Sequence, residues 1–251
     1  MFPESSRTYA HGYAVVAIDV IRATTSAVTV VANGGRCFPV PSVETAHRLA
    51  TRLLNPLLVG EIGGEIPPRF HMNNSPAQLA RLPDVTRPVI LLSSSGTRLL
   101  HETRNCDATY LACLRNWSHT ARYLARHHGC VALIGAGTRG QPREEDQLCC
   151  AWIAGALLAA GFAAGNNRTE AVVKDWVARG SEAILKSKSV QYLKNTGQLQ
   201  DLDFILSHID DIPKAFVQEE GEVLMASPKQ PRSIAPARDA RATSVVRSEI
   251  C

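Results

Sequence analysis

The chain contains 251 residues, of which 45% are hydrophobic and 20% are charged, and its formal net charge is +4. A chain of this length can bury a hydrophobic core without disulfide bonds, and this composition excludes the disordered, collagen-like and coiled-coil classes. Residues 227–251 account for +3 of the net charge, and the rest of the chain has no run of basic residues with interleaved aromatics, so we expect no nucleic-acid partner.

Residues 1–12 are interpreted as an N-terminal extension. They contain Glu4 and Arg7 and no apolar segment of the kind that a secretory signal needs. The seven cysteines include the neighbours Cys149 and Cys150, which are poorly placed for a disulfide bond with each other. Both features favour a reducing compartment, and the sequence therefore predicts a cytoplasmic protein.

Short apolar strands alternate with helices between residue 13 and residue 217. Strands are predicted over 13–18, 37–40, 57–59, 88–92, 130–134 and 215–217, and helices over 27–32, 43–54, 77–82, 118–127 and 169–185. This alternation is typical of an α/β fold with a mostly parallel or mixed sheet and helices on both faces. Residues 13–226 are therefore predicted to form an α/β domain, in one lobe or two.

An uncharged stretch over residues 148–165 approaches the length of a membrane-spanning helix. Half of it is Ala and Gly, and three acidic residues precede it, so we expect a helix buried in the α/β core and no membrane partner. Residues 227–251 are rich in Pro, Ser, Arg and Ala without periodicity, which predicts a disordered basic tail. An interaction of this tail with nucleic acid is an alternative.

The loop after the first strand carries an acidic residue, Asp19, followed by Arg22, Thr24 and Thr25. A carboxylate can bind a metal ion, while a guanidinium group and hydroxyls are suited to phosphate oxygens. In sheets of this kind ligands bind beyond the carboxyl ends of the strands, where such loops meet. The alternative is structural, with Asp19 as a helix cap and Arg22 exposed.

Polar residues with similar chemistry follow the later strands. The segment Ser93-Ser94-Ser95-Gly96-Thr97-Arg98 supplies hydroxyl, N–H and guanidinium donors for an anion, although Ser, Thr and Gly are also ordinary capping and turn residues. Glu61 follows the strand over 57–59, and Glu144-Glu145-Asp146 precedes the stretch over 148–165. Mg²⁺ prefers such carboxylate oxygens, although acidic residues at a helix start are also favoured by the helix dipole.

The segment over 135–140 has the pattern G-x-G-x-x-G after a predicted strand. In a dinucleotide site a helix follows this pattern directly, and an acidic residue ends a strand about twenty residues later. Neither feature is found in this sequence. An NAD(P)-binding oxidoreductase is therefore a less favoured alternative.

Five segments together resemble the 2-phosphosulfolactate phosphatase family in their order and spacing across residues 13–223. They are Asp19-Val-Ile-Arg-Ala-Thr-Thr-Ser, Gly60-Glu61-Ile-Gly-Gly, Asn74-Ser-Pro, Ser95-Gly-Thr-Arg and Glu145-Asp146. The resemblance implies a three-layer α/β/α fold and Mg²⁺-dependent hydrolysis of 2-phospho-3-sulfolactate to 3-sulfolactate, a step of coenzyme M synthesis. The sequence departs from the family pattern at Ile62, Asn73 and Ser95, where the family has arginine, glycine and asparagine.

The segments and the resemblance together give a predicted site. The expected catalytic residues are Asp19, Arg22, Arg98 and Asp146, and the expected Mg²⁺ ligands are Asp19, Glu145 and Asp146. Substrate binding is expected from Thr24, Thr25, Glu61, Gly63, Asn74, Ser75, Ser95, Gly96 and Thr97. The expected partner is a small phosphorylated organic acid, and a homo-oligomer is left open. The attacking group is left open between Asp19 and a water molecule.

Two alternatives keep the same fold. The departures at Ile62, Asn73 and Ser95 would also fit a protein that binds anions without turning them over. A phosphatase of this fold could also act on another phosphorylated metabolite.

Overall fold

The structure is a computed structural model of the chain, and it describes residues 8–138, 141–227 and 244–250. Its strands are β1 Ala14–Ile18, β2 Cys37–Val40, β3 Leu57–Gly60, β4 Val89–Leu92, β5 Ala108–Ala112, β6 Cys130–Gly135, β7 Ala163–Ala164, β8 Phe216–Glu219, β9 Glu222–Met225 and β10 Val245–Ile250. The α-helices are α1 Ala23–Ala32, α2 Val43–Ala50, α3 Pro76–Leu79, α4 Gly96–Glu102, α5 Trp117–His127, α6 Glu144–Ala159, α7 Asn167–Trp176, α8 Lys188–Asn195 and α9 Leu199–Ser207. A 3₁₀ helix, η2, covers Ser181–Lys186.

The described strands form one sheet in the order β3-β4-β2-β9-β8-β5-β1-β6-β10-β7. One parallel group contains β5, β1, β6, β10 and β7, and a second contains β3, β4 and β2. The antiparallel hairpin β8–β9 joins the two groups. The predicted α/β fold with a mostly parallel, mixed sheet flanked by helices is therefore confirmed.

The central strand β1 is buried on both faces, and its alternate residues pack against different helices. Ile18 belongs to the same hydrophobic cluster as Leu148 of α6, whereas Ala17 belongs to the cluster that contains Leu99 of α4. Helices α6 and α4 therefore cover opposite faces of β1. Helices α1 and α4 also contact strands of the second parallel group. The three-layer α/β/α order stays a prediction.

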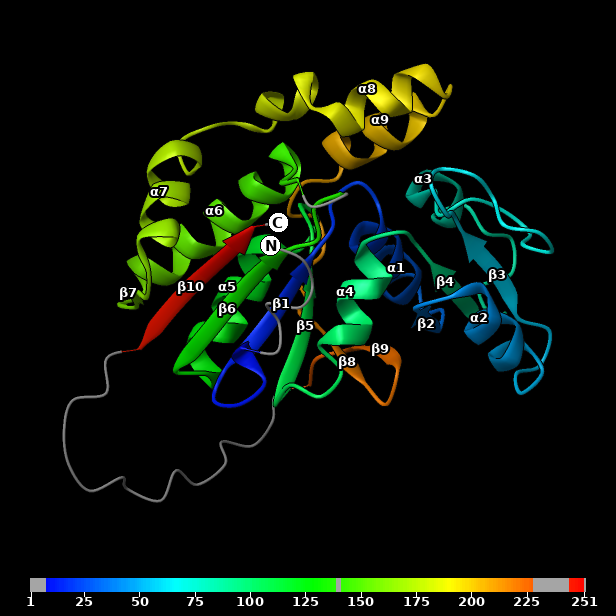
Figure 1. Cartoon of the computed structure of the whole chain (residues 1–251), viewed down its shortest axis with the longest axis horizontal. Helices are drawn as coiled ribbons and strands as arrows, with labels where there is room; N and C mark the ends of the chain where they lie inside the picture. The colour runs from blue at the N-terminus through cyan, green and yellow to red at the C-terminus, as the bar shows by residue number, and fades with distance from the viewer. Residues whose placement is uncertain (1–7, 139–140, 228–243, 251) are drawn as a thin grey trace.

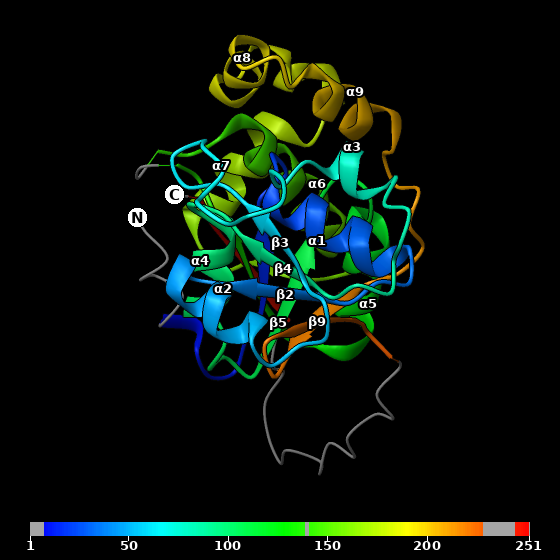
Figure 2. The same ribbon diagram turned by 90° about the vertical axis from the view of Figure 1, so that its right-hand side faces the viewer.

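Helices α8 and α9 lie above the loop that joins β1 to α1, at the top of both views (Figures 1 and 2). Figure 2 faces the group β2, β4 and β3 and shows α9 next to α3, and α3 and α9 are in contact. Helices α8 and α9 come between β7 and β8 in the chain, and they lie at the end of the sheet at which β1 stops. They therefore take part in the candidate site.

Several predicted elements differ from the structure. The predicted disordered tail is wrong for β10, which pairs in parallel with β6 and β7, while residues 228–243 lie outside the described residues. The helix predicted over 169–185 is divided into α7 and η2. Strands β5 and β9 were not predicted. Tyr9 of the predicted N-terminal extension is buried beside Tyr13, so this part of the extension packs onto the domain.

Helix α6 corresponds to the long uncharged stretch. It begins at Glu144, and the chain turns at Gly161, whose φ of +96° suits glycine, before β7. Most of its residues are buried around its whole circumference, which is expected for a helix inside an α/β core. Across the described residues, none of the helices has both the length and the apolar character needed to span a membrane.

Candidate active site

A cavity of about 460 Å³ lies where the loops after β1, β3, β4 and β6 meet helix α8. Its volume is within the range of small-molecule binding sites. The residues in its wall are Asp19, Ile21, Arg22, Glu61, Gly63, Gly64, Asn74, Ser93, Ser94, Ser95, Arg98, Ala136, Thr138, Arg143, Lys188, Ser189 and Tyr192. Loops from both parallel groups of the sheet therefore line one site.

Asp19 directly follows β1 and is 7% exposed, so its carboxylate is largely removed from water. Helix α4 begins against this carboxylate, because a Cβ atom added to Gly96 would lie 2.2 Å from Asp19 Oδ2. Only glycine allows so close an approach of the α4 backbone. Gly96 thus fixes the distance between Asp19 and the segment that carries Ser95 and Arg98.

Three carboxylates around the end of β1 are buried together. The pKa of Asp19 is raised to about 7, chiefly by burial. A hydrogen bond with the backbone of Ala23 lowers it, and the negative charges of Glu61 and Glu145 raise it. Burial also raises the pKa of Asp146 well above its usual value, with added repulsion from Asp19 and Glu145. A positive charge next to these three carboxylates would therefore stabilise their ionised forms.

Asp146 is held in place by backbone groups from two different loops. Its Oδ1 accepts a hydrogen bond of 2.9 Å from the N–H of Val20, and its Oδ2 accepts one of 3.2 Å from the N–H of Gly137. The loop with the G-x-G-x-x-G pattern thus uses a backbone N–H to bind a carboxylate of the protein. Helix α6 begins only at Glu144, well after β6, so the context of a dinucleotide site is absent from these described residues.

Glu145 is 1% exposed, and burial raises its pKa, while hydrogen bonds with Ser189 and Ser187 lower it in part. Within the described chain its Oε2 atom has no hydrogen-bond partner. A buried carboxylate oxygen without a partner is costly, so Oε2 is a free donor atom for a cation.

The predicted Mg²⁺ ligands have the oxygen atoms that a cation needs, but the three side chains do not converge on one point. Among the described residues no group of three His, Cys, Asp or Glu side chains is arranged to hold a metal ion. Mg²⁺ is usually bound by one or two carboxylates together with water and substrate oxygens, so a complete protein cage is not required. Asp19, with Glu145 or Asp146, therefore offers a suitable donor set.

Arg22 is buried, which excludes the alternative in which it is an exposed residue near a helix cap. Its Nη1 donates to Asp201 Oδ2 at 2.6 Å and to Gln198 Oε1, and its Nη2 donates to Asn73 Oδ1 at 3.0 Å. An arginine side chain has five N–H donors, so two remain for a ligand. Arg22 lines the cavity, but its charge is already paired.

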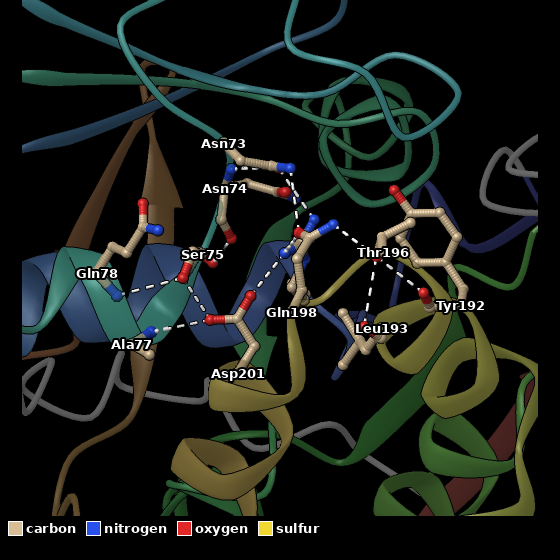
Figure 3. Close-up of polar contacts among 12 residues, drawn as sticks. Asn73, Asn74, Ser75, Ala77, Gln78, Tyr192, Leu193, Thr196, Gln198 and Asp201 are labelled. Carbon is tan, nitrogen blue, oxygen red and sulfur yellow. Dashed lines mark hydrogen bonds and ion pairs between the residues drawn. The ribbon is translucent and has the colours of Figure 1, made fainter.

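Asp201 of α9 connects several of these segments and is fully buried. Its Oδ1 accepts hydrogen bonds from the hydroxyl of Ser75 and from the N–H of Ala77 at 3.3 Å (Figure 3). Ser75 is predicted to bind substrate, but it caps α3 by accepting from Gln78 N and does not line the cavity. Its placement therefore supports a structural role.

Asn74 is 2% exposed and lines the cavity, as predicted for a substrate-binding residue. Its Oδ1 atom has no hydrogen-bond partner among the described residues, although it is buried. The preceding Asn73 Oδ1 accepts from the N–H of Asn74 at 2.7 Å and fixes the loop. The Asn74 amide is thus available to a ligand.

Three predicted substrate-binding threonines do not lie in the cavity wall. Thr24 Oγ1 lies 2.8 Å from the carbonyl oxygens of Asp19 and Ala112, to which its single O–H can donate, and Thr25 Oγ1 donates to Val20 O at 2.7 Å. Thr97 Oγ1 donates to Ser93 O at 3.0 Å. These hydroxyls satisfy backbone groups and shape the loops, so the structure places them behind the site.

Glu61, Gly63, Ser95 and Arg98 all line the cavity as predicted. Glu61 joins the β3 and β4 loops, because it accepts hydrogen bonds from the N–H of Ser94 at 2.8 Å, from its hydroxyl at 2.9 Å and from the N–H of Gly64 at 2.7 Å. Arg98 is exposed. Its guanidinium group has no acidic partner within the described part of the chain.

Part of the cavity wall is formed by residues that the sequence patterns did not indicate. Lys188, Ser189 and Tyr192 of α8 line the cavity, and the Tyr192 hydroxyl donates to Gly64 O at 3.0 Å. Arg143, the residue before α6, lies in the same wall. Helix α8 does not follow a strand, so no local pattern marks its residues, and Arg143 lies well beyond the end of β6, directly before α6.

Known proteins provide an independent comparison. A family model described as 2-phosphosulpholactate phosphatase matches residues 1–220. A probable 2-phosphosulfolactate phosphatase of Symbiobacterium thermophilum is 33% identical over 214 residues, which cover 83% of this chain and 84% of the relative. Proteins with the same name from Carboxydothermus hydrogenoformans and a Synechococcus strain are each 31% identical, over 90% and 85% of this chain and 95% and 89% of their own length.

The family model spans most of the chain, and the relatives match it over nearly their whole length. The segments that carry Asp19, Glu61, Asn74 and Arg98 lie within the matched residues and meet at one cavity. This chain belongs to the 2-phosphosulpholactate phosphatase family.

Proposed function

We propose that this chain is a Mg²⁺-dependent phosphoric monoester hydrolase that converts 2-phospho-3-sulfolactate and water to 3-sulfolactate and inorganic phosphate. The names of its relatives support this substrate. The single observation that carries the proposal is the buried Asp19 carboxylate, with a pKa raised to about 7, in a cavity that also exposes Arg98. A carboxylate and a guanidinium group facing one cavity suit a cation and a phosphate group together.

Asp19 would hold Mg²⁺ together with Glu145 or Asp146. When it is bound, Mg²⁺ supplies positive charge to the phosphoryl oxygens and so favours the transition state of phosphoryl transfer. The mutual repulsion of the three buried carboxylates supports this assignment, because a cation between them would relieve it.

Arg98 and the serines of the β4 loop would bind and orient the phosphate oxygens. Ser95 and Arg98 both line the cavity next to Gly96, which contacts Asp19. The free Oδ1 of Asn74 would accept a hydrogen bond from a hydroxyl group or a bound water. The two remaining N–H groups of Arg22 would donate hydrogen bonds to the substrate. They would add little net positive charge, because Asp201 balances the charge of Arg22.

Asp19 has two chemical roles open to it. It can accept a proton from the attacking water, or its carboxylate can attack phosphorus and form a phosphoaspartate that water then hydrolyses. Trapping with beryllofluoride separates these routes, because only the second gives a stable adduct on Asp19. Both routes need the unprotonated carboxylate.

The proposal is tested by phosphate release from a panel of phosphorylated hydroxy acids, with Mg²⁺ and with EDTA. We expect release that requires Mg²⁺ and is fastest for the substrate with a sulfonate group. Exposed Asp175 supplies a matched control for Asp19, since Asp175→Asn should leave the rate unchanged. Release that is equal in EDTA would count against a metal-dependent reaction.

One rival function has a specific observation in its favour. The chain carries isoleucine, asparagine and serine at positions 62, 73 and 95, where the family resemblance expects other residues, and Asn73 and Ser95 lie in or next to the cavity wall. A protein that binds the substrate without turnover would show ligand-dependent stabilisation but no phosphate release.

The proposed phosphatase function also includes a cytoplasmic location and a place in coenzyme M synthesis.

A further inference from the structure

We infer that Arg143 and Lys188 form a second anion-binding subsite that holds the non-reacting sulfonate group of the substrate, on the opposite side of the cavity from Arg98. The inference rests on the proposed function and names the residues that select the substrate. Both side chains line the cavity, and the sequence patterns assigned a role to neither of them.

The fold places the two cationic walls on opposite sides of the end of β1. Helix α4, which carries Arg98, packs on the face of β1 that contains Ala17, whereas α6, which follows Arg143, packs on the face that contains Ile18. Figure 1 shows α4 and α6 on either side of β1. A ligand at the end of β1 therefore meets one cationic wall on each side.

The reacting phosphate belongs at the Arg98 wall. Gly96 lies against the carboxylate of Asp19, so the segment with Ser95 and Arg98 is the wall in direct contact with the proposed catalytic group. The wall with Arg143 and Lys188 is then left for a part of the substrate that does not react.

The charges of the second wall are not neutralised by the described residues around them. Arg143 Nε is buried and has no hydrogen-bond partner in the described chain. Lys188 Nζ donates to the amide oxygen of Gln141 at 2.8 Å, and that oxygen carries no formal charge. Two cations, one of them with a buried unpaired N–H, form a site that favours an anion.

The charged groups in the wall of the whole cavity favour an anionic ligand. The described wall contains four cations, Arg22, Arg98, Arg143 and Lys188, and two carboxylates, Asp19 and Glu61. Asp201 already balances Arg22, and Mg²⁺ would balance Asp19. Arg98, Arg143 and Lys188 then remain against one carboxylate, Glu61, which leaves an excess of positive charge that favours an anionic ligand.

The cavity also has room for more than a phosphate group. A volume of about 460 Å³ corresponds to on the order of fifteen water molecules at the density of the liquid. A sulfonate stays fully charged at neutral pH and has three acceptor oxygens, so it can accept from a guanidinium group and an ammonium group together. The subsite therefore predicts selection for this group.

The test compares two ligands that differ only in the sulfonate, 3-sulfolactate and lactate, by calorimetric binding to the Mg²⁺-loaded protein. We expect Arg143→Ala and Lys188→Ala each to weaken 3-sulfolactate binding by about 10-fold to 100-fold, the effect of one charge-assisted hydrogen bond, and to leave the weak lactate binding unchanged. Lys188→Arg should retain most of the affinity. Lys186→Ala, an exposed neighbour outside the cavity wall, is the matched control.

Kinetics with 2-phosphosulfolactate and 2-phospholactate give the second readout. The subsite predicts that both alanine variants raise KM for the sulfonated substrate and change kcat/KM for 2-phospholactate by less than about 3-fold. Equal losses for the two substrates, or unchanged 3-sulfolactate binding, would overturn the inference. If the unmodified chain releases no phosphate, the proposed function fails, while sulfonate-dependent binding still decides the subsite.

Discussion

Arg22 and Asp201 form a buried ion pair, with 2.6 Å between Nη1 and Oδ2, that joins the loop after β1 to helix α9. Their side chains are 4% and 0% exposed. The pair connects the proposed phosphate site to helix α9. Because Asp201 neutralises the charge of Arg22, a substrate would meet little net positive charge at this residue.

Replacing Asp201 with asparagine should destabilise the fold strongly. The substitution leaves the Arg22 charge buried without a partner, which costs about 3–5 kcal/mol. Denaturant unfolding measures this loss. The exposed pair between Arg36 and Glu222 is the control, since Glu222→Gln should change the free energy of unfolding by less than about 1 kcal/mol. A similar small effect in Asp201→Asn would show that the buried pair is not a structural link.

Replacing Asp19 with asparagine should stabilise the metal-free protein at alkaline pH. Because the pKa of Asp19 is raised from 3.8 to about 7 in the folded state, the folded chain binds the proton more tightly than the unfolded chain. This contribution to stability is present below about pH 4 and is lost as the pH rises through 7. At pH 8 the variant should therefore be more stable by about 2–4 kcal/mol.

The measurement is urea unfolding of both proteins in EDTA at several pH values between 4 and 8. The expected difference between the variant and the unmodified chain is small at pH 4 and grows until about pH 7. A difference that does not change with pH would contradict a raised pKa at this carboxylate. Addition of Mg²⁺ should stabilise only the unmodified chain.

Magnesium affinity should fall as the pH is lowered. A metal ion and a proton compete for the same carboxylate, so the apparent Kd for Mg²⁺ should increase by up to about 10-fold per pH unit below pH 7. Titration calorimetry at pH 6, 7 and 8 measures this dependence. Glu145→Gln should weaken Mg²⁺ binding as well, whereas binding that is insensitive to both pH and this variant would remove Glu145 and Asp19 from the ligand set.

Replacing Gly96 with alanine should reduce activity without unfolding the protein. The added Cβ atom would lie 2.2 Å from Asp19 Oδ2, so either the carboxylate or the start of α4 must move. A displacement of this size at a reacting group is expected to lower kcat by about 100-fold. Gly129→Ala is the control because a Cβ atom there meets nothing within 4 Å. Equal activities of the two variants would show that this contact does not position Asp19.

The sheet and the centre of the site could be predicted because they depend on local patterns. Strand β2 has the predicted limits, and Asp19 and Arg98 lie in the cavity as the loops after β1 and β4 indicate. Strand β5 was missed because its sequence, Ala-Thr-Tyr-Leu-Ala, contains no clear run of β-branched residues. Strand β10 was missed because composition indicated a tail, and its pairing with β6 is a contact distant in sequence.

The residues that complete the site could not be predicted from the sequence in the same way. Lys188 and Tyr192 lie on a short helix whose polar side chains are typical of any exposed surface, and only the packing of α8 over the β3 loop brings them to the cavity. Thr24 and Thr25 are the opposite case, because the sequence assigned them to the site and the structure does not place them in the cavity wall. Their chemistry suits a phosphate, but their hydroxyls bind backbone carbonyl groups instead, a choice that depends on rotamers rather than on sequence.

The central claim is that Asp19 and Mg²⁺ act together on a phosphate monoester. It is tested most directly by steady-state phosphate release from 2-phosphosulfolactate during a Mg²⁺ titration of the unmodified chain and of Asp19→Asn. We predict saturable Mg²⁺-dependent release by the unmodified chain and at least a 1,000-fold lower kcat in the variant, about 4 kcal/mol in the barrier. Release by Asp19→Asn at a comparable rate and with the same Mg²⁺ dependence would contradict this account.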